Sequence, residues 1–105
     1  MVSKVSVAEL NTLLAETPDL FVLDVREPNE YQEKHLPTAY LMPLATVPIR
    51  INEVDKNQTI YVVCRSGARS MQAAQWLDTQ GYEAVNIEGG TDAWAESGFE
   101  IKTGD

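Results

Sequence analysis

The sequence predicts an α/β domain with a mainly parallel sheet and helices on both of its faces. Short runs of consecutive apolar residues recur along the chain, and such runs are typical of parallel strands that are buried on both faces. Amphipathic segments separate the runs, which indicates right-handed crossovers between neighbouring strands. The chain has 105 residues, of which 44% are hydrophobic and 23% charged, so we expect one globular domain over residues 1–105.

The elements of the first third alternate between helix and strand. Ser6 and Glu9 have the spacing of a capping box, and leucines follow at helical intervals, so a helix is expected to end near residues 17–18. The apolar run 20–23 predicts a buried strand. Pro28 then predicts a short helix up to residue 33, because proline suits the first turn of a helix.

The rest of the chain continues the alternation around one ambiguous segment, 44–54, for which a helix broken by Pro48 is the favoured interpretation. A helix of about 70–80 carries an apolar stripe, and Gly81 is suited to end it. A turn at Gly89 and Gly90 is expected to lead into a last short helix. The remaining strands are predicted over 40–42, 60–63 and 84–87, and the last helix over 91–97.

Charge and composition exclude several classes of function. A net charge of −8 disfavours binding to nucleic acid and to anionic membranes. The chain has no apolar run near the roughly 18 residues that a membrane span needs, and its start lacks the apolar core of a secretion signal. With one cysteine and one histidine, an internal disulfide and a multi-cysteine metal site are excluded. We therefore expect a soluble cytoplasmic protein without nucleic-acid or membrane partners.

The single cysteine lies where chemistry is expected. Cys64 directly follows the predicted strand 60–63, at the sheet edge where α/β folds place their sites. Gly67 permits a tight turn, and the helix that follows offers unpaired amides and a positive dipole end. Arg65 and Arg69 add positive charge. All of these features favour a thiolate and attract an anion, so we predict a functional thiol rather than an inert buried cysteine.

Several segments resemble the rhodanese superfamily. Residues 62–70, Val-Val-Cys-Arg-Ser-Gly-Ala-Arg-Ser, are similar to its active-site loop. Residues 23–31, 77–82 and 87–94 resemble the other signatures of the family. The resemblance covers nearly the whole chain. It implies a three-layer fold with a five-stranded parallel sheet in the order 1-5-4-2-3, and transfer of sulfane sulfur through a cysteine persulfide.

One stretch departs from the family pattern. Lys34 and Thr38 stand where the family commonly has glycine. If these positions required a positive φ, both residues would be strained. His35, the only histidine, is expected to be structural rather than a base for Cys64.

The predicted reaction needs no cofactor and no metal. The Cys64 thiolate attacks the outer sulfur of a small anionic donor such as thiosulfate, sulfite leaves, and a thiol or cyanide accepts the sulfur.

Trp76 and Trp94 are expected to pack rather than to bind substrate. The predicted substrate-binding residues are Arg65, Ser66, Gly67, Ala68, Arg69 and Ser70. Supporting roles are predicted for Asp24, Arg26, Gly89 and Gly90.

Two other functions are considered. Phosphatases and arsenate reductases of this architecture use Cys-x5-Arg, whereas Cys64 and Arg69 form Cys-x4-Arg and Val63 rather than histidine precedes the cysteine. The shorter loop should fit a single sulfur atom better than a phosphate. Alternatively, the domain is a persulfide relay that docks onto a sulfur-accepting protein, which would use the same loop. Binding of such a protein, with weak activity towards small donors, would distinguish the relay.

Overall fold

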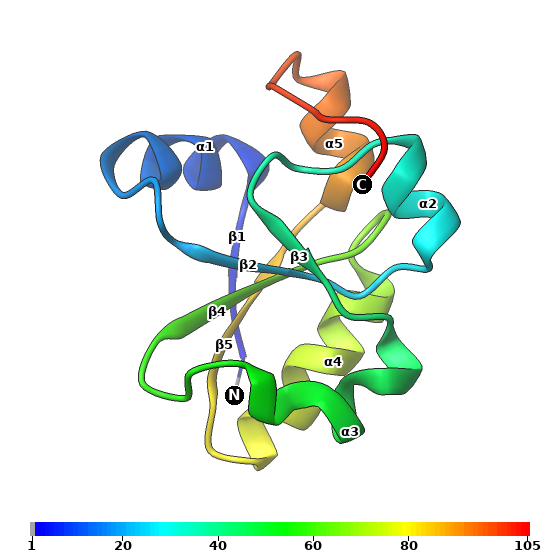
Figure 1. The fold of residues 1–105 in the computed structure, drawn as a ribbon. Coiled ribbons are helices and arrows are strands. Elements are labelled where there is room, and N and C mark those ends of the chain that lie inside the picture. The colour runs from blue at the N-terminus through cyan, green and yellow to red at the C-terminus, as the bar shows by residue number, and fades with distance from the viewer. Residues whose placement is uncertain (1) are drawn as a thin grey trace.

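The computed structural model describes residues 2–105 and contains one parallel sheet between two layers of helices (Figure 1). The strand order is β1-β5-β4-β2-β3, and every neighbouring pair is parallel. This order and the α/β architecture confirm the predicted fold class. The strands are β1 (Ser3–Val5), β2 (Phe21–Asp24), β3 (Ala39–Leu41), β4 (Thr59–Val63) and β5 (Glu83–Ile87).

Helices cover both faces of the sheet. The α-helices are α1 (Val7–Glu16), α2 (Pro28–Glu33), α3 (Val47–Arg50), α4 (Ala68–Thr79) and α5 (Gly90–Glu96), and two 3₁₀ turns, η1 (Leu44–Thr46) and η2 (Ile51–Glu53), flank α3. In Figure 1, α1 and α5 lie on one side of the sheet and α3 and α4 on the other. None of the helices within residues 2–105 is long and apolar enough to cross a membrane.

Each face of the sheet has its own apolar core. Leu23 and Val62 point towards the α3 and α4 side, whereas Val22, Val63 and Ile87 point towards α1 and α5. All five side chains are 0% exposed. Burial on both faces explains why the strands are continuous apolar runs, and each such side chain contributes roughly 1.5–3 kcal/mol to folding.

Local signals in the sequence account for most helix starts. The capping box predicted at Ser6 is present, since the Glu9 amide donates to Ser6 Oγ at 3.1 Å and the Ser6 amide donates to Glu9 Oε1 at 3.0 Å. Pro28 lies in the first turn of α2, as predicted. The interpretation of Pro48 as a helix breaker is wrong, because this proline lies in the first turn of α3, where no amide hydrogen is needed.

The loop after α2 adopts unstrained backbone conformations. Within residues 2–105 only glycines have a positive φ, and Lys34 is extended at φ −168°. The two positions that lack the family's glycines therefore do not require a left-handed backbone here. His35 instead pairs with Lys102 through two backbone hydrogen bonds of 2.9 Å, which ties the C-terminal segment to this loop.

Candidate active site

Cys64 directly follows the central strand β4, at the carboxyl edge of the sheet. Its side chain is 1% exposed. Its carbonyl oxygen accepts hydrogen bonds from the amide and the hydroxyl of Thr91, at 2.9 and 3.3 Å. The start of the loop is thereby fixed to the start of α5.

The loop turns polar hydrogens towards the sulfur. The Gly67 amide donates to Cys64 Sγ at 3.1 Å, and Ser70 Oγ lies 3.3 Å from the same atom. Gly67 has φ 115° and immediately precedes α4, which begins at Ala68 rather than near residue 70. A side chain would disfavour this left-handed conformation, so glycine is needed to bring the amide against the sulfur.

Hydrogen bonds hold the pKa of Cys64 below its usual value. Burial acts in the opposite direction and raises the pKa. The Ser70 hydroxyl and the backbone amides of Ser70, Gly67 and Ser66 outweigh that cost, because each favours the thiolate. The loop therefore favours the nucleophilic form of the only cysteine.

A buried polar group behind the loop holds Ser70. Ser70 is 0% exposed and Asn86 is 4% exposed. The two side chains approach to 2.5 Å between Ser70 Oγ and Asn86 Oδ1, and Asn86 Nδ2 donates to the Gly67 carbonyl at 3.3 Å. Asn86 was not among the site residues predicted from the sequence. The sequence could have indicated this residue, because it is the one polar residue in the apolar run 84–87.

The turn before α5 packs tightly against the loop. A Cβ atom at Gly90 would lie 2.5 Å from the Arg65 carbonyl oxygen and closer still to that of Cys64. Gly90 also has φ +61°. Only glycine permits both the conformation and the approach. The supporting role predicted for Gly89 and Gly90 remains a prediction, but the structure places them beside the loop.

Each arginine of the loop lies beside a carboxylate. The guanidinium of Arg69 donates to Glu30 of α2 through Nη1 at 2.7 Å and Nη2 at 2.8 Å. Arg65 Nε lies 3.4 Å from Asp92 of α5. The Arg69 hydrogen bonds lower the pKa of Glu30 to about 2, despite the opposing effect of burial. Neither pairing was predicted from the sequence, and the predicted contacts of both arginines with substrate remain predictions.

Asp24 and Arg26 form a buried ion pair at the end of β2. Arg26 Nη2 donates to Asp24 Oδ2 at 2.8 Å, and both side chains are at most 3% exposed. The same guanidinium donates to the carbonyls of Lys34, at 2.8 Å, and Glu30, at 3.3 Å. The pair thus fixes α2 to the sheet edge and sets the position of Glu30.

Comparison with known proteins identifies the family. The family model of the rhodanese-like domain matches residues 6–97. This chain belongs to the rhodanese-like domain family. The finding confirms the resemblance that the loop and the other segments indicated.

Related proteins and structures resemble this rhodanese-like domain over most of its length. A sulfurtransferase of Allochromatium vinosum is 40% identical over 102 residues, which cover 96% of this chain and 95% of that protein. Thiosulfate sulfurtransferase GlpE of Pseudoalteromonas translucida is 35% identical over 91 residues and covers 86% of each chain. A crystal structure of a rhodanese-like domain protein from Staphylococcus aureus matches with a TM-score of 0.87 and 36% identity, over 97% of this chain and 100% of that one. These similarities support sulfur transfer as the general chemistry of the domain.

His35 has a structural place in the rhodanese-like domain. It is 2% exposed, Nδ1 lies 2.7 Å from the Tyr31 carbonyl oxygen, and its ring stacks on that of Tyr31 with centroids 3.7 Å apart. These contacts tie the histidine to α2, in agreement with the structural role expected.

Residues 2–105 contain no group of three or more His, Cys, Asp or Glu side chains that could hold a metal ion.

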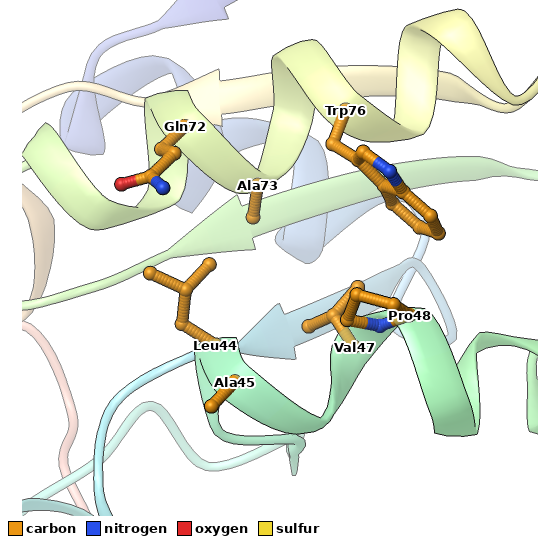
Figure 2. A pocket seen from close by; sticks show the side chains of 7 residues that line it. All are labelled: Leu44, Ala45, Val47, Pro48, Gln72, Ala73 and Trp76. Atoms are coloured by element: carbon orange, nitrogen blue, oxygen red, sulfur yellow. The ribbon is translucent and has the colours of Figure 1, made fainter.

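An apolar groove of about 340 Å³ lies between α4 and the η1–α3 segment (Figure 2). Trp76 forms one wall and also packs against the core on this face. No residue of the loop 64–70 lines the groove. Trp94 is buried on the opposite face, where its Nε1 donates to the Glu100 carbonyl at 2.7 Å. Trp94 is thus part of one core and Trp76 packs at the edge of the other, while the expectation that neither binds substrate remains a prediction.

Proposed function

We propose that this rhodanese-like domain is a sulfurtransferase that carries sulfur as a persulfide on Cys64. The observation that carries the proposal is the approach of two donors, the Gly67 amide and the Ser70 hydroxyl, to Cys64 Sγ at 3.1 and 3.3 Å. Donors at these distances favour an anionic sulfur, which is the nucleophilic form. The relatives named as sulfurtransferases support the same chemistry.

In the first step, the Cys64 thiolate attacks the outer sulfur of an anionic donor such as thiosulfate. A bond forms between Sγ and that sulfur, while the donor's own S–S bond breaks and its electron pair leaves on sulfite. The cysteine is only 1% exposed, so the loop suits a donor that presents one sulfur atom end-on. A phosphoryl group, with three oxygens around its centre, needs a wider ring of amides than this one.

In the second step, cyanide or a thiolate attacks the terminal sulfur of the persulfide. The persulfide bond breaks, its electron pair returns to Sγ, and the Cys64 thiolate is restored. The loop amides and Ser70 stabilise Sγ as it regains negative charge. The cycle is covalent catalysis on one cysteine and requires no cofactor and no second thiol.

The acceptor distinguishes an enzyme from a relay. A small thiol acceptor makes the domain a sulfurtransferase in its own right. A sulfur-accepting protein would make it a relay, with Cys64 passing its sulfur on after docking. The same persulfide serves both, so the two functions differ in the relative rates of sulfur transfer to small thiols and to protein thiols.

The test is sulfur transfer from thiosulfate to cyanide, measured as thiocyanate. The wild-type protein is expected to catalyse it, and the Cys64→Ser variant is expected to lose it while keeping its fold by circular dichroism. Equal activity in the variant would remove the proposal. Hydrolysis of an aryl phosphate through Cys64, faster than sulfur transfer, would favour a phosphatase instead.

A further inference from the structure

The carboxylate of Glu30 is held firmly against the active loop. Oε1 accepts hydrogen bonds from Arg69 Nη1 at 2.7 Å and from the Glu27 amide at 3.0 Å, while Oε2 accepts one from Arg69 Nη2 at 2.8 Å. Its side chain is 19% exposed. Because Arg26 donates to the Glu30 carbonyl, the backbone of this residue is fixed as well. Glu30 is therefore a preformed partner for the guanidinium and needs no rearrangement to bind it.

The other cations around the loop are also matched by carboxylates. Arg65 lies 3.4 Å from Asp92, and Lys34 Nζ lies 4.0 Å from the same residue. Arg26 is paired with Asp24 at 2.8 Å. Among the residues described around Cys64, positive charge is thus accompanied by negative charge. The donors that directly contact the sulfur are an amide and a hydroxyl.

Arg69 is the cation of the loop that Glu30 binds. It belongs to the loop 64–70, whose Gly67 amide contacts Cys64 Sγ, and its guanidinium remains 35% exposed while it donates to both carboxylate oxygens of Glu30. A guanidinium recognises a sulfonate with the same pair of parallel N–H groups that it uses for a carboxylate. A sulfonate that binds Arg69 while its outer sulfur meets Cys64 has to displace Glu30 from the two N–H groups of this guanidinium.

Sulfur donors differ in how much they need that fork. Thiosulfate carries two negative charges and three sulfonate oxygens, which a guanidinium can bind. An alkyl persulfide, R–S–SH, has no sulfonate. The Cys64 thiolate bonds to its terminal sulfur, the S–S bond of the donor breaks, and the electron pair of that bond leaves on the inner sulfur as the thiolate RS⁻. The proton stays on the transferred sulfur. Such a donor needs only the hydrogen bonds that the loop provides around the sulfur.

We propose that Glu30 is a specificity-determining residue that holds the guanidinium of Arg69 and thereby disfavours sulfonate-bearing donors relative to alkyl persulfides. The inference rests on the proposed function of Cys64 as a sulfur carrier. It adds the class of sulfur donor that the loop selects when Arg69 is paired with Glu30. Thiosulfate remains a substrate, at a rate limited by the competition with Glu30.

The test compares two donors in the full chain. The second-order rate constant for loading one sulfur onto Cys64 is measured by mass spectrometry with thiosulfate and with 2-hydroxyethyl persulfide. In Glu30→Gln, which frees Arg69 from a charged partner, the ratio of the thiosulfate to the persulfide rate constant is expected to rise roughly 10-fold, as one charge-assisted contact predicts. Thermal unfolding confirms that each variant is folded at the assay temperature.

Two matched variants control the result. Glu33→Gln removes the same charge from the exposed end of α2 and is expected to keep the wild-type ratio. Glu30→Gln combined with Arg69→Gln leaves no guanidinium to be freed, so the gain is expected to disappear.

Distinct outcomes overturn the inference and the proposed function. If Cys64 is loaded but Glu30→Gln changes both rate constants by the same factor, Glu30 does not select the donor. A gain that persists in the double variant overturns the inference as well, because it would not depend on Arg69. If neither donor adds sulfur to Cys64 of the wild-type protein, the proposed function fails and this inference fails with it.

Discussion

Ser70 Oγ lies 3.3 Å from Cys64 Sγ, and both side chains are buried. The hydroxyl has one proton, and Asn86 Oδ1 accepts from the same oxygen at 2.5 Å. The Gly67 carbonyl, at 3.1 Å, is a further acceptor for that proton, and a thiolate is a stronger acceptor than a thiol. Ser70 can therefore respond to the charge on the sulfur without moving its backbone, both before attack and after transfer.

Replacing Ser70 with alanine is expected to raise the pKa of Cys64 and to slow sulfur transfer. The thiolate loses its side-chain donor, while the burial that opposes ionisation remains. A hydrogen bond to a charged group contributes roughly 1.5–3 kcal/mol, so kcat/KM for thiosulfate should fall roughly 10- to 150-fold. Steady-state kinetics measure the fall. Ser97→Ala, at the exposed end of α5, is the matched control. Unchanged kinetics in Ser70→Ala would assign the stabilisation of sulfur to the amides alone.

The alkylation of Cys64 should begin at lower pH than that of an ordinary thiol. The hydrogen bonds of the loop hold its pKa down, so the thiolate fraction at neutral pH is larger than that of free cysteine. The measurement is the rate of reaction with iodoacetamide between pH 5 and about 10. We expect its midpoint below that of free cysteine under the same conditions. A midpoint at or above the free-cysteine value would contradict the electrostatic account.

The substitution Gly90→Ala should destabilise the domain and disturb the loop. The added Cβ would meet the Cys64 and Arg65 carbonyls, and the backbone has φ +61°. We expect a loss of about 2–4 kcal/mol of unfolding free energy, measured by denaturant titration. Gly98→Ala is the control, because Gly98 also has a positive φ of +79° but has nothing within 4 Å of the added atom. That variant should lose only about 1–2 kcal/mol, and an equal loss in both would mean that the close approach is unimportant.

The Glu30–Arg69 pair should stabilise the fold in a defined range of pH. The pKa of Glu30 is lowered from 4.5 to about 2, so its contribution is complete above about pH 4.5 and is lost as the pH falls towards about 2. Because Arg69 is 35% exposed, solvent weakens the pair, and we expect roughly 0.5–1 kcal/mol. The difference in unfolding free energy between the wild type and Glu30→Gln should therefore shrink between pH 6 and 3. A difference independent of pH would point to packing instead.

Patterns confined to neighbouring residues predicted most of the fold. The capping box at Ser6, the proline at the start of α2 and the apolar runs of the inner strands all describe local chemistry, so sequence alone revealed them. Strand β1 was not among the strands predicted from the pattern, because three residues show no usable periodicity. Its pairing with β5 depends on residues about eighty positions away.

Contacts between distant segments explain what the sequence did not predict at the site. Arg69 and Glu30 are separated by 39 positions, so nothing in the loop itself indicates that the guanidinium is paired. The early start of α4 was missed because its first residue follows a glycine in a left-handed conformation rather than a polar capping side chain. The position of Cys64 was predictable, since an apolar run that ends at a lone cysteine places it at the sheet edge.

The central claim is that Cys64 carries sulfur, and the mass of the intact protein tests it most directly. After treatment with thiosulfate and removal of the excess, we expect the wild-type protein to gain the mass of one sulfur atom, located on Cys64 by peptide mapping. Cyanide should then remove that mass with release of thiocyanate. Cys64→Ser should gain nothing. A wild-type protein that transfers sulfur while its mass never changes, or a gain of sulfur that persists in Cys64→Ser, would contradict the account.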